Sequence, residues 1–346
     1  MKLEQTESTG VARMRKSAIK GIGYHVPAQV ITNHDLIDLM ETSEEWIKTR
    51  SGIEERHWVQ GDEAASDLAF PAAKMSIENA GITPEEIDLV VVATLTADYF
   101  FPGVSSQLQD MLGLRNVGCF DIRAACSGFV YALSTADQFI RSGMYNTALV
   151  IGAEAQSKFI NKTTEGRDIS VLFGDGAGAV LLEPSEEFGI IDSELRIDGT
   201  GGEFLRVDGG GSLHPASHET VSNKLHYVRQ DGKTVYKFAV RGMADISYEV
   251  AERNNLKGDD ISLFIPHQAN KRIIDAAAKR LGLKESQVMI NIDTYANTTS
   301  ATIPICIAEV SEKNMLNIGD NVIISTFGAG FSWGAMYLKW GMQANA

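Results

Sequence analysis

The first half of the chain alternates continuous apolar runs with segments in which apolar residues recur at helical spacing. The runs at 87–94 and 146–154 have strand length and are mostly apolar, which is typical of strands buried on both faces of a parallel sheet. Residues 64–80 and 105–112 have apolar positions three and four residues apart and predict helices. Gly81 is expected to end the first of these helices. This alternation predicts an α/β fold.

The second half of the chain repeats this order of elements. The same criteria predict strands at 261–266 and 321–327 and helices at 238–254, 271–281 and 302–310. Two glycine-rich turns, at 174–179 and 328–330, each run into an apolar strand. Strand 261–266 therefore corresponds to 87–94, and the chain is predicted to contain a duplicated unit.

The repeat divides the chain into a tail and two halves. Residues 1–16 are polar and are expected to form a mobile tail. The halves are predicted at 17–185 and 186–346. Residues 197–231 are rich in Gly and His with little periodicity, so they are expected to form an irregular excursion at the surface.

Composition fits a globular protein with a large core. The 346 residues are 44% hydrophobic and 22% charged. A formal net charge of -14 argues against general binding of nucleic acid or of anionic lipid surfaces. The polar N-terminus is not that of a signal peptide, and no apolar run approaches the roughly 20 residues of a membrane span. A cytoplasmic location is expected.

The number of cysteines also favours a cytoplasmic location. The chain has three cysteines, Cys119, Cys126 and Cys306. An odd, low count in a long chain argues against a disulfide framework and favours a reducing compartment. Because no pair has CxxC spacing, a thiolate metal site is not expected.

Cys126 is the first candidate for chemistry. The residues after it, including Phe129, Val130 and Leu133, predict a helix, which places the thiol at a helix N-terminus. The positive end of the helix dipole there is expected to lower the pKa of the thiol and raise its nucleophilic fraction. The alternative is a small buried cysteine packed as a hydrophobe.

His267 and Asn297 are the candidates to assist a cysteine nucleophile. His267 follows a predicted strand and Pro266, and Asn297 lies in a loop that leads into a helix. Polar groups at the ends of buried strands gather at one rim of an α/β sheet. A satisfied structural histidine and a helix-capping asparagine are the alternatives. Gly328 and Gly330 would allow a backbone N–H to approach a ligand closely, or would simply make a tight turn.

Five motifs in order resemble one family. They are Asp121–Leu133 around Cys126, 174–179, 266–270, 295–301 and 327–334. Together they resemble β-ketoacyl-acyl-carrier-protein synthase III, the initiating condensing enzyme of dissociated fatty acid synthesis. The resemblance runs from about Ser17 to the C-terminus. It implies the thiolase-like fold, with two duplicated α/β halves in a five-layer αβαβα arrangement.

The resemblance also implies a reaction. Cys126, His267 and Asn297 would form a catalytic triad, and the backbone N–H groups of Cys126 and Ala329 an oxyanion hole. The enzyme would catalyse a ping-pong, decarboxylative condensation of a short acyl-CoA primer, such as acetyl-CoA, with malonyl-acyl-carrier protein. Asn297 favours this initiating branch over relatives that use a second His or a Glu. No metal or organic cofactor is implied.

Further positions match the family's binding sites. Trp46, Arg50 and Arg167 resemble its CoA contacts, and Phe173 a wall of the acyl pocket. Phe101 resembles a residue that closes the pocket of the partner subunit, which implies a homodimer. The resemblance assigns carrier-protein binding to Lys237, Arg241, Lys271, Arg272, Lys279 and Arg280. An amphipathic helix with a buried Trp and a solvated helix face are the alternatives.

Some residues depart from the family pattern. Ala329 and Ala296 stand where glycine is usual. Arg123, close before Cys126, is expected at a buried rim and should be paired, with Asp121 or Glu154 as candidates. These departures leave the choice of primer open.

Three other functions compete with this hypothesis. The first is a sister thiolase-fold enzyme of secondary metabolism that uses longer acyl donors. The second is a nucleotide-binding protein built on Gly174–Gly178, but that segment lacks the GxGxxG spacing. The third is a non-catalytic subunit, against which an intact Cys-His-Asn set argues.

Overall fold

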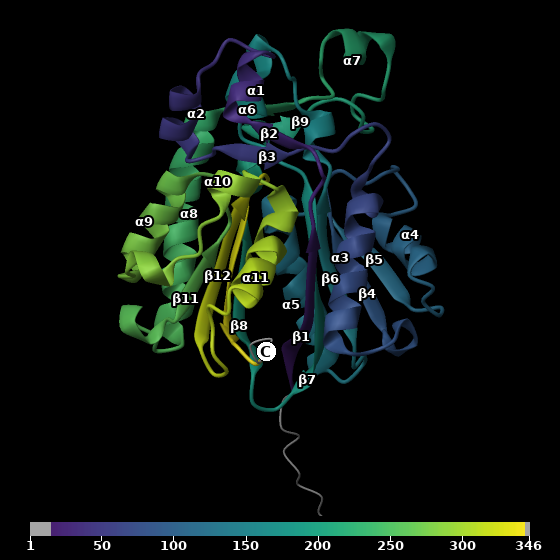
Figure 1. Cartoon of the computed structure of the whole chain (residues 1–346), viewed down its shortest axis with the longest axis vertical. Helices are drawn as coiled ribbons and strands as arrows, with labels where there is room; N and C mark the ends of the chain where they lie inside the picture. Colours follow the sequence, from purple (N-terminus) through teal and green to yellow (C-terminus); the bar gives the residue numbers. More distant parts are fainter. Residues whose placement is uncertain (1–14, 343–346) are drawn as a thin grey trace, which may run out of the picture.

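The first half of the chain forms a five-stranded sheet in this computed structural model, which describes residues 15–342 (Figure 1). The strand order is β1-β7-β6-β4-β5, with β4 parallel to β5 and β6 and the pairs β6–β7 and β7–β1 antiparallel. The strands are β1 (Lys16–His25), β4 (Leu89–Ala93), β5 (Gly118–Ile122), β6 (Ala148–Glu154) and β7 (Gly176–Ser185). The predicted tail at 1–16 lies almost wholly outside the described residues.

The second half forms a four-stranded sheet with the same pattern. Its order is β11-β12-β13-β8, with one parallel pair followed by two antiparallel pairs, whereas the first sheet has a further parallel pair at β5. The strands are β8 (Gly189–Ile197), β11 (Leu263–Pro266), β12 (Asn321–Gly328) and β13 (Ser332–Lys339). The predicted duplication is confirmed, since β11 and β12 take the places of β4 and β6. We propose the boundary at 185/186, between β7 and β8.

Helices cover both sheets and separate them. Helices α5 (Gly128–Arg141) and α11 (Thr302–Glu312) lie between the sheets (Figure 1). The outer faces are covered by α3 (Ala65–Ala80) and α4 (Val104–Met111) on the first sheet, and by α8 (Gly232–Arg253) and α9 (Lys271–Leu281) on the second. This is the expected five-layer αβαβα fold. Its central core joins buried side chains of both halves, such as Phe129, Leu133, Ile303 and Ile307.

Short elements gather at one end of the two sheets, at the top of Figure 1. They are β2 (Val30–Thr32), β3 (Glu55–His57), β9 (Leu205–Val207), β10 (Val228–Gln230), α1 (Asn33–Ile37), α2 (Glu44–Ser51), α6 (Arg167–Ser170), α7 (His218–Ser222) and α10 (Ile292–Tyr295). The segment expected to be irregular therefore contains the antiparallel pair β9–β10 and the helix α7. No helix within residues 15–342 is long and apolar enough to cross a membrane.

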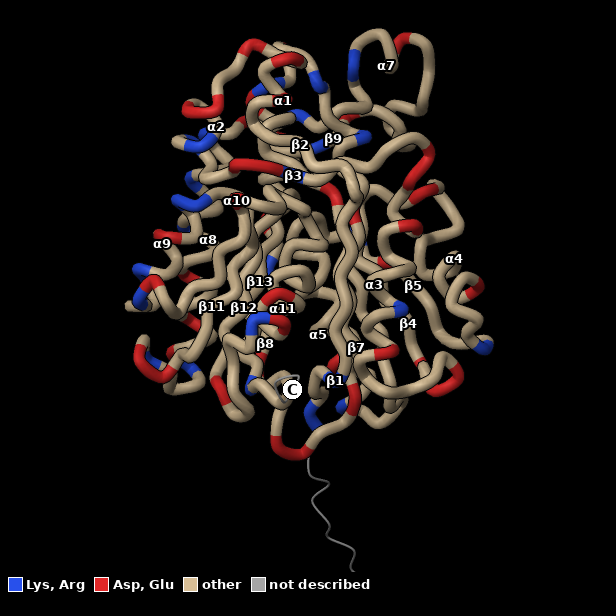
Figure 2. Tube along the Cα trace, viewed as in Figure 1, with Lys and Arg blue, Asp and Glu red and all other residues tan. Residues whose placement is uncertain are grey.

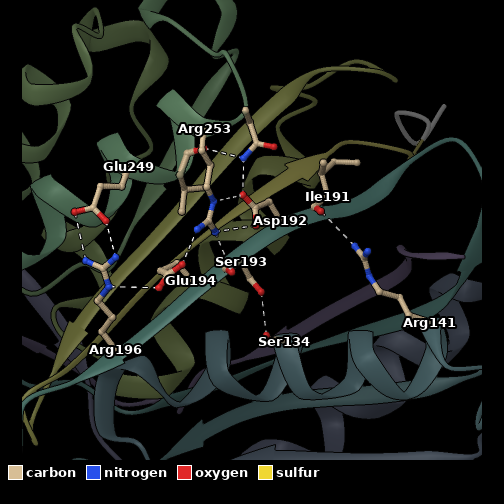
Figure 3. Close-up of polar contacts among 11 residues, drawn as sticks. Ser134, Arg141, Ile191, Asp192, Ser193, Glu194, Arg196, Glu249 and Arg253 are labelled. Atoms are coloured by element: carbon tan, nitrogen blue, oxygen red, sulfur yellow. Dashed lines mark hydrogen bonds and ion pairs between the residues drawn. The ribbon is translucent and has the colours of Figure 1, made fainter. Parts of the chain in front are cut away.

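Helix α8 and strand β8 also differ from the sequence prediction, because polar contacts define them. Helix α8 begins at Gly232 rather than near 238, since the Asp231 carboxylate accepts a hydrogen bond from the Thr234 N–H and caps it. Strand β8 was not predicted, because polar side chains interrupt its apolar residues. Figure 3 shows how they are satisfied: Arg253 of α8 pairs with Asp192 at 2.5 Å and with Glu194 at 2.6 Å.

Candidate active site

A cavity of about 730 Å³ lies among α2, α8 and α9 and extends to Cys126, His267 and Asn297. The three side chains come from distant parts of the chain and are all buried. The first half supplies Cys126, and the second half supplies His267 and Asn297. The three residues predicted from sequence thus line one cavity, at the junction of the two halves.

Cys126 is the middle residue of a 3₁₀ turn, Ala125–Ser127, that leads into α5. The turn begins with Ala125 in the left-handed region at φ 49°. It lies against β12, where a Cβ atom on Gly328 would be only 2.8 Å from the Cys126 nitrogen. Glycine is therefore required at 328 for the turn to approach this strand.

Burial controls the acidity of the Cys126 thiol. We expected the helix N-terminus to lower its pKa, and this expectation was wrong. Desolvation raises the pKa of Cys126 to about 12, and a negative charge on Glu154 would raise it further. The resting nucleophile is therefore a thiol, and its proton must leave when the acyl donor is attacked.

His267 directly follows β11, and its backbone N–H donates to the Ser325 carbonyl at 2.8 Å. Its side chain is 2% exposed, and burial lowers its pKa to about 3. Neither ring nitrogen has a hydrogen-bond partner within the described part of the chain. The imidazole is therefore neutral and can donate from one nitrogen and accept at the other.

Asn297 is held on both its backbone and its side chain. Its N–H donates to the Leu172 carbonyl at 2.9 Å, and its carbonyl accepts from the Gly174 N–H at 3.1 Å. Its Oδ1 accepts from the Thr299 N–H at 2.9 Å. Because the oxygen is occupied, the amide presents Nδ2 as its donor. The preceding Ala296 has φ 56°, which explains why glycine suits this position.

The expected oxyanion hole matches the structure only in part. Cys126 and Gly328 line the cavity, but Ala329 does not. Ala329 is half-buried, and its carbonyl accepts a hydrogen bond from the Ser332 hydroxyl at 2.9 Å. The assignment of the Ala329 N–H stays a prediction.

Trp46 and two arginines stack at the mouth of the cavity. The guanidinium carbons of Arg50 and Arg167 lie 4.5 Å and 4.7 Å from the centroid of the Trp46 ring. Trp46 and Arg50 share α2, whereas Arg167 reaches over from α6 and donates to the Glu41 carbonyl at 2.8 Å. The three predicted CoA contacts therefore form one cluster.

The two predicted acyl-pocket residues lie apart. Phe173 is buried and lines the cavity. Phe101 does not line it and is 80% exposed, in a loop that also exposes Tyr99 and Phe100. Phe101 therefore does not close this cavity of its own chain.

The basic residues of α8 and α9 divide into two groups. Arg272 lines the cavity and donates to the Thr49 carbonyl at 3.0 Å, so it belongs to the mouth. The other predicted members lie on the outer surface, where Asp245 comes within 3.5 Å of Arg241 and 3.8 Å of Arg280, and Asp275 within 2.8 Å of Lys271. Lys237 and Lys279 are exposed. Figure 2 shows basic positions on α2 and α9 along the same side of the molecule.

Sequence reasoning missed part of the cavity wall. Leu205, Gln230, Lys233 and Tyr236 also line it. They fall in the aperiodic segment and in the unpredicted first turns of α8. The polar stretch after Asp231, a residue that favours helix N-caps, was the available signal.

Arg123 is exposed, so the expectation that it sits at a buried rim was wrong. Its two candidate partners are used elsewhere. The Asp121 carboxylate accepts from the Val104 and Ser105 N–H groups at the start of α4. Glu154 is fully buried among other groups.

Comparisons with known proteins agree with this arrangement. Two family models match, 3-oxoacyl-[acyl-carrier-protein] synthase III over residues 120–199 and its C-terminal model over 251–340. The chain is 46% identical over 327 residues to beta-ketoacyl-[acyl-carrier-protein] synthase III 2 of Bacteroides thetaiotaomicron, with 94% of this chain and 96% of that protein covered.

Two solved structures extend the comparison. The crystal structure of 3-oxoacyl-[acyl-carrier-protein] synthase III from Aquifex aeolicus has a TM-score of 0.87 at 40% identity, covering 94% of this chain and all of that one. The priming β-ketosynthase of a polyketide biosynthetic pathway has a TM-score of 0.88 at 33% identity, with coverage of 95% and 97%.

Proposed function

This chain belongs to the β-ketoacyl-[acyl-carrier-protein] synthase III family, and from that premise we propose how its cavity performs the condensation. It is an acyltransferase that initiates fatty acid biosynthesis. Curated relatives of that name reach 46% identity, whereas the polyketide priming enzyme reaches 33%, so the sister enzyme of secondary metabolism is not favoured. The observation that carries the proposal is that Cys126, His267 and Asn297 line one cavity.

The first proposed step acylates Cys126. The thioester carbon of a short acyl-CoA is attacked by the Cys126 sulfur as the thiol loses its proton. We assign the neutral imidazole of His267 to take this proton during the attack and to return it to the CoA sulfur as the thioester bond breaks, so that CoA leaves as the thiol. Backbone N–H groups at Cys126 and in the turn after β12 stabilise the oxyanion.

The second proposed step uses malonyl-acyl-carrier protein. Loss of carbon dioxide leaves an enolate, which needs hydrogen-bond donors at its oxygen. The imidazole of His267 and Nδ2 of Asn297 can supply them, and neither carries a negative charge that would repel the enolate. The carbanion then attacks the acyl-Cys126 carbonyl, the bond from that carbon to the Cys126 sulfur breaks, and the 3-oxoacyl product leaves while the sulfur regains a proton. None of these steps calls on a metal or an organic cofactor.

We propose separate groups of residues for binding CoA and carrier protein. We assign the adenine end of CoA to Trp46, Arg50 and Arg167, because a flat ring can stack against an indole and a guanidinium. Carrier protein, which is acidic, is assigned to the basic outer residues of α8 and α9. Trp46, Arg50 and Arg272 of α9 line the same cavity.

We also propose a homodimer in the cytoplasm. Strand β5 is the edge of its sheet, and the exposed aromatic loop at Tyr99, Phe100 and Phe101 offers an apolar surface to a partner. Phe101 would then reach the partner's acyl pocket. The low, odd cysteine count is the feature that supports the reducing compartment.

Intact mass spectrometry tests the proposed function. Wild-type protein is incubated with acetyl-CoA and with longer and branched acyl-CoAs, and malonyl-carrier protein is then added. An acyl adduct that Cys126→Ala lacks, followed by a 3-oxoacyl product, supports the proposal. No product with any short donor overturns it.

A further inference from the structure

Glu154 is a buried acid that the proposed mechanism does not use. It ends β6, is 0% exposed, and lies close enough to Cys126 for its charge to affect the thiol. Its carboxyl group contacts the Ser300 hydroxyl at 2.7 Å, the Thr96 hydroxyl at 2.7 Å and the Leu95 N–H at 3.1 Å. All three partners are uncharged.

The Ser300 hydroxyl oxygen makes two short contacts, each of which needs a proton, but the hydroxyl group has only one. Its Oγ lies 2.8 Å from the Ala93 carbonyl oxygen and 2.7 Å from Oε1 of Glu154. A hydroxyl has one proton, and a carbonyl has none to give. If Ser300 donates to Ala93, the short contact with Glu154 has a proton only when the carboxyl group is protonated and donates to Ser300.

The other carboxyl oxygen fits this assignment. The Thr96 hydroxyl oxygen accepts from the Ala155 N–H at 2.8 Å, so its own proton is free to go to Oε2 of Glu154. The Leu95 N–H lies 3.1 Å from the same oxygen and 3.2 Å from Oε1. A neutral acid with one O–H donor and one accepting oxygen therefore gives Ser300, Thr96 and Leu95 a partner each.

We propose that Glu154 is a permanently protonated carboxylic acid that positions Asn297 for catalysis by holding the turn Thr299–Ala301. Ser300 is the middle residue of this turn. The Thr299 N–H next to it fixes Oδ1 of Asn297. The inference rests on the proposed role of Asn297 in stabilising the enolate.

The neutral form also suits the nucleophile. Burial raises the pKa of Glu154, and the ionisable side chain that faces it is the Cys126 thiol. The hydroxyl side chains of Ser300, Thr96 and Thr299, which also face it, carry no charge. An ionised Glu154 would oppose thiolate formation at Cys126, whereas the neutral acid does not.

Two substitutions distinguish the effect of the polar contacts of Glu154 from the effect of its side-chain size. Glu154→Gln keeps a donor for Ser300 and an acceptor for Thr96 and Leu95, so we expect steady-state turnover within about threefold of wild type. Glu154→Leu keeps the size but no polar contact. We expect it to lose about 100-fold in decarboxylation of malonyl-carrier protein while it retains acylation of Cys126. Equal losses in both variants overturn the proposal.

The pH dependence of Cys126 alkylation is the readout that packing alone would not move. Glu154→Gln should show the wild-type profile, because no charge is removed. Faster alkylation of Glu154→Gln at neutral pH means that the native carboxyl group is ionised, and the proposal fails.

Denaturant unfolding tests whether native Glu154 is protonated. It does not depend on enzyme activity or on whether Glu154→Leu folds. The unfolded chain releases the Glu154 proton above pH 4.5, whereas the native state keeps it. Wild type should therefore lose stability relative to Glu154→Gln, by tenfold in the unfolding equilibrium constant per pH unit above 4.5. A constant ratio overturns the proposal. Absence of any acyl adduct on wild type would instead overturn the proposed function.

Discussion

Cys126 and Ser300 occupy the same position in the two halves of the fold. Each is the middle residue of a 3₁₀ turn that leads into a central helix. Each follows a residue in the left-handed region, Ala125 at φ 49° and Thr299 at φ 51°. One turn carries the nucleophile, and its counterpart adjoins Asn297.

Each turn packs against the strand of the opposite half. A Cβ atom on Gly328 of β12 would meet the Cys126 nitrogen at 2.8 Å, and one on Gly152 of β6 would meet the Ser300 carbonyl oxygen at 2.3 Å. The two glycines thus allow the turns to cross, and this crossing brings residues of both halves into one cavity.

The Gly328 contact predicts a specific loss. Gly328→Ala should slow acylation of Cys126 at least tenfold, because the new methyl group must displace the turn. The rate of acyl adduct formation by mass spectrometry checks this. Gly199→Ala is the control, since a Cβ atom there meets nothing within 4 Å. Normal acylation by Gly328→Ala would contradict the packing argument.

The donor roles of His267 and Asn297 predict a split between half-reactions. Asn297→Ala should lower decarboxylation of malonyl-carrier protein by about 10²–10³ while acylation of Cys126 continues. Single-turnover assays of each half-reaction separate the two. His267→Ala should also impair decarboxylation more than acylation, and equal loss of both in the two variants would refute the split.

The pKa of Cys126 predicts how alkylation depends on pH. Since that pKa is raised to about 12, the thiolate fraction should grow about tenfold per pH unit throughout the neutral range. Iodoacetamide labelling of Cys126, followed by peptide mass spectrometry, measures the profile. Cys126→Ala corrects for labelling of the half-buried Cys119. A plateau below pH 8 would mean that the thiol is activated in the resting enzyme.

Burial of neutral His267 predicts acid sensitivity. Its pKa falls from 6.5 to about 3 on folding, so below pH 6.5 the unfolded chain binds a proton that the native state does not. The free energy of unfolding should fall by about 1.4 kcal/mol per pH unit between 6.5 and 3 from this group. Urea unfolding of wild type and His267→Gln at fixed protein concentration compares the slopes. Parallel curves would show that His267 does not contribute.

Asp245 predicts a gain in carrier-protein binding. It lies within 4 Å of both Arg241 and Arg280, so Asp245→Asn should leave two guanidinium groups without a paired charge and lower the KM for malonyl-carrier protein. High salt should remove the difference. Glu78→Gln, which affects only the exposed pair with Lys74 on α3, is the control. An unchanged KM would exclude this surface.

Sequence patterns predicted the elements in which apolar residues form a run or recur at a regular spacing. They failed where polar partners that are distant in sequence determine the element. Helix α9 was predicted at 271–281 and was confirmed. Strand β8 was missed because its acidic side chains pair with arginines such as Arg253 of α8, and no local pattern encodes that pairing. The predicted direction of the Cys126 pKa shift was wrong for a related reason. The sequence indicated the start of the helix but not how deeply the thiol is buried.

Each half of the fold needs the other to bury the apolar faces of the central helices. Helix α11 of the second half packs on β1 and β7 of the first, and α5 of the first half contacts β8 and β13 of the second. A chain cut between β7 and β8 would therefore give two fragments that each expose an apolar face. Enzyme activity regained on mixing the two fragments would report reassembly of the halves.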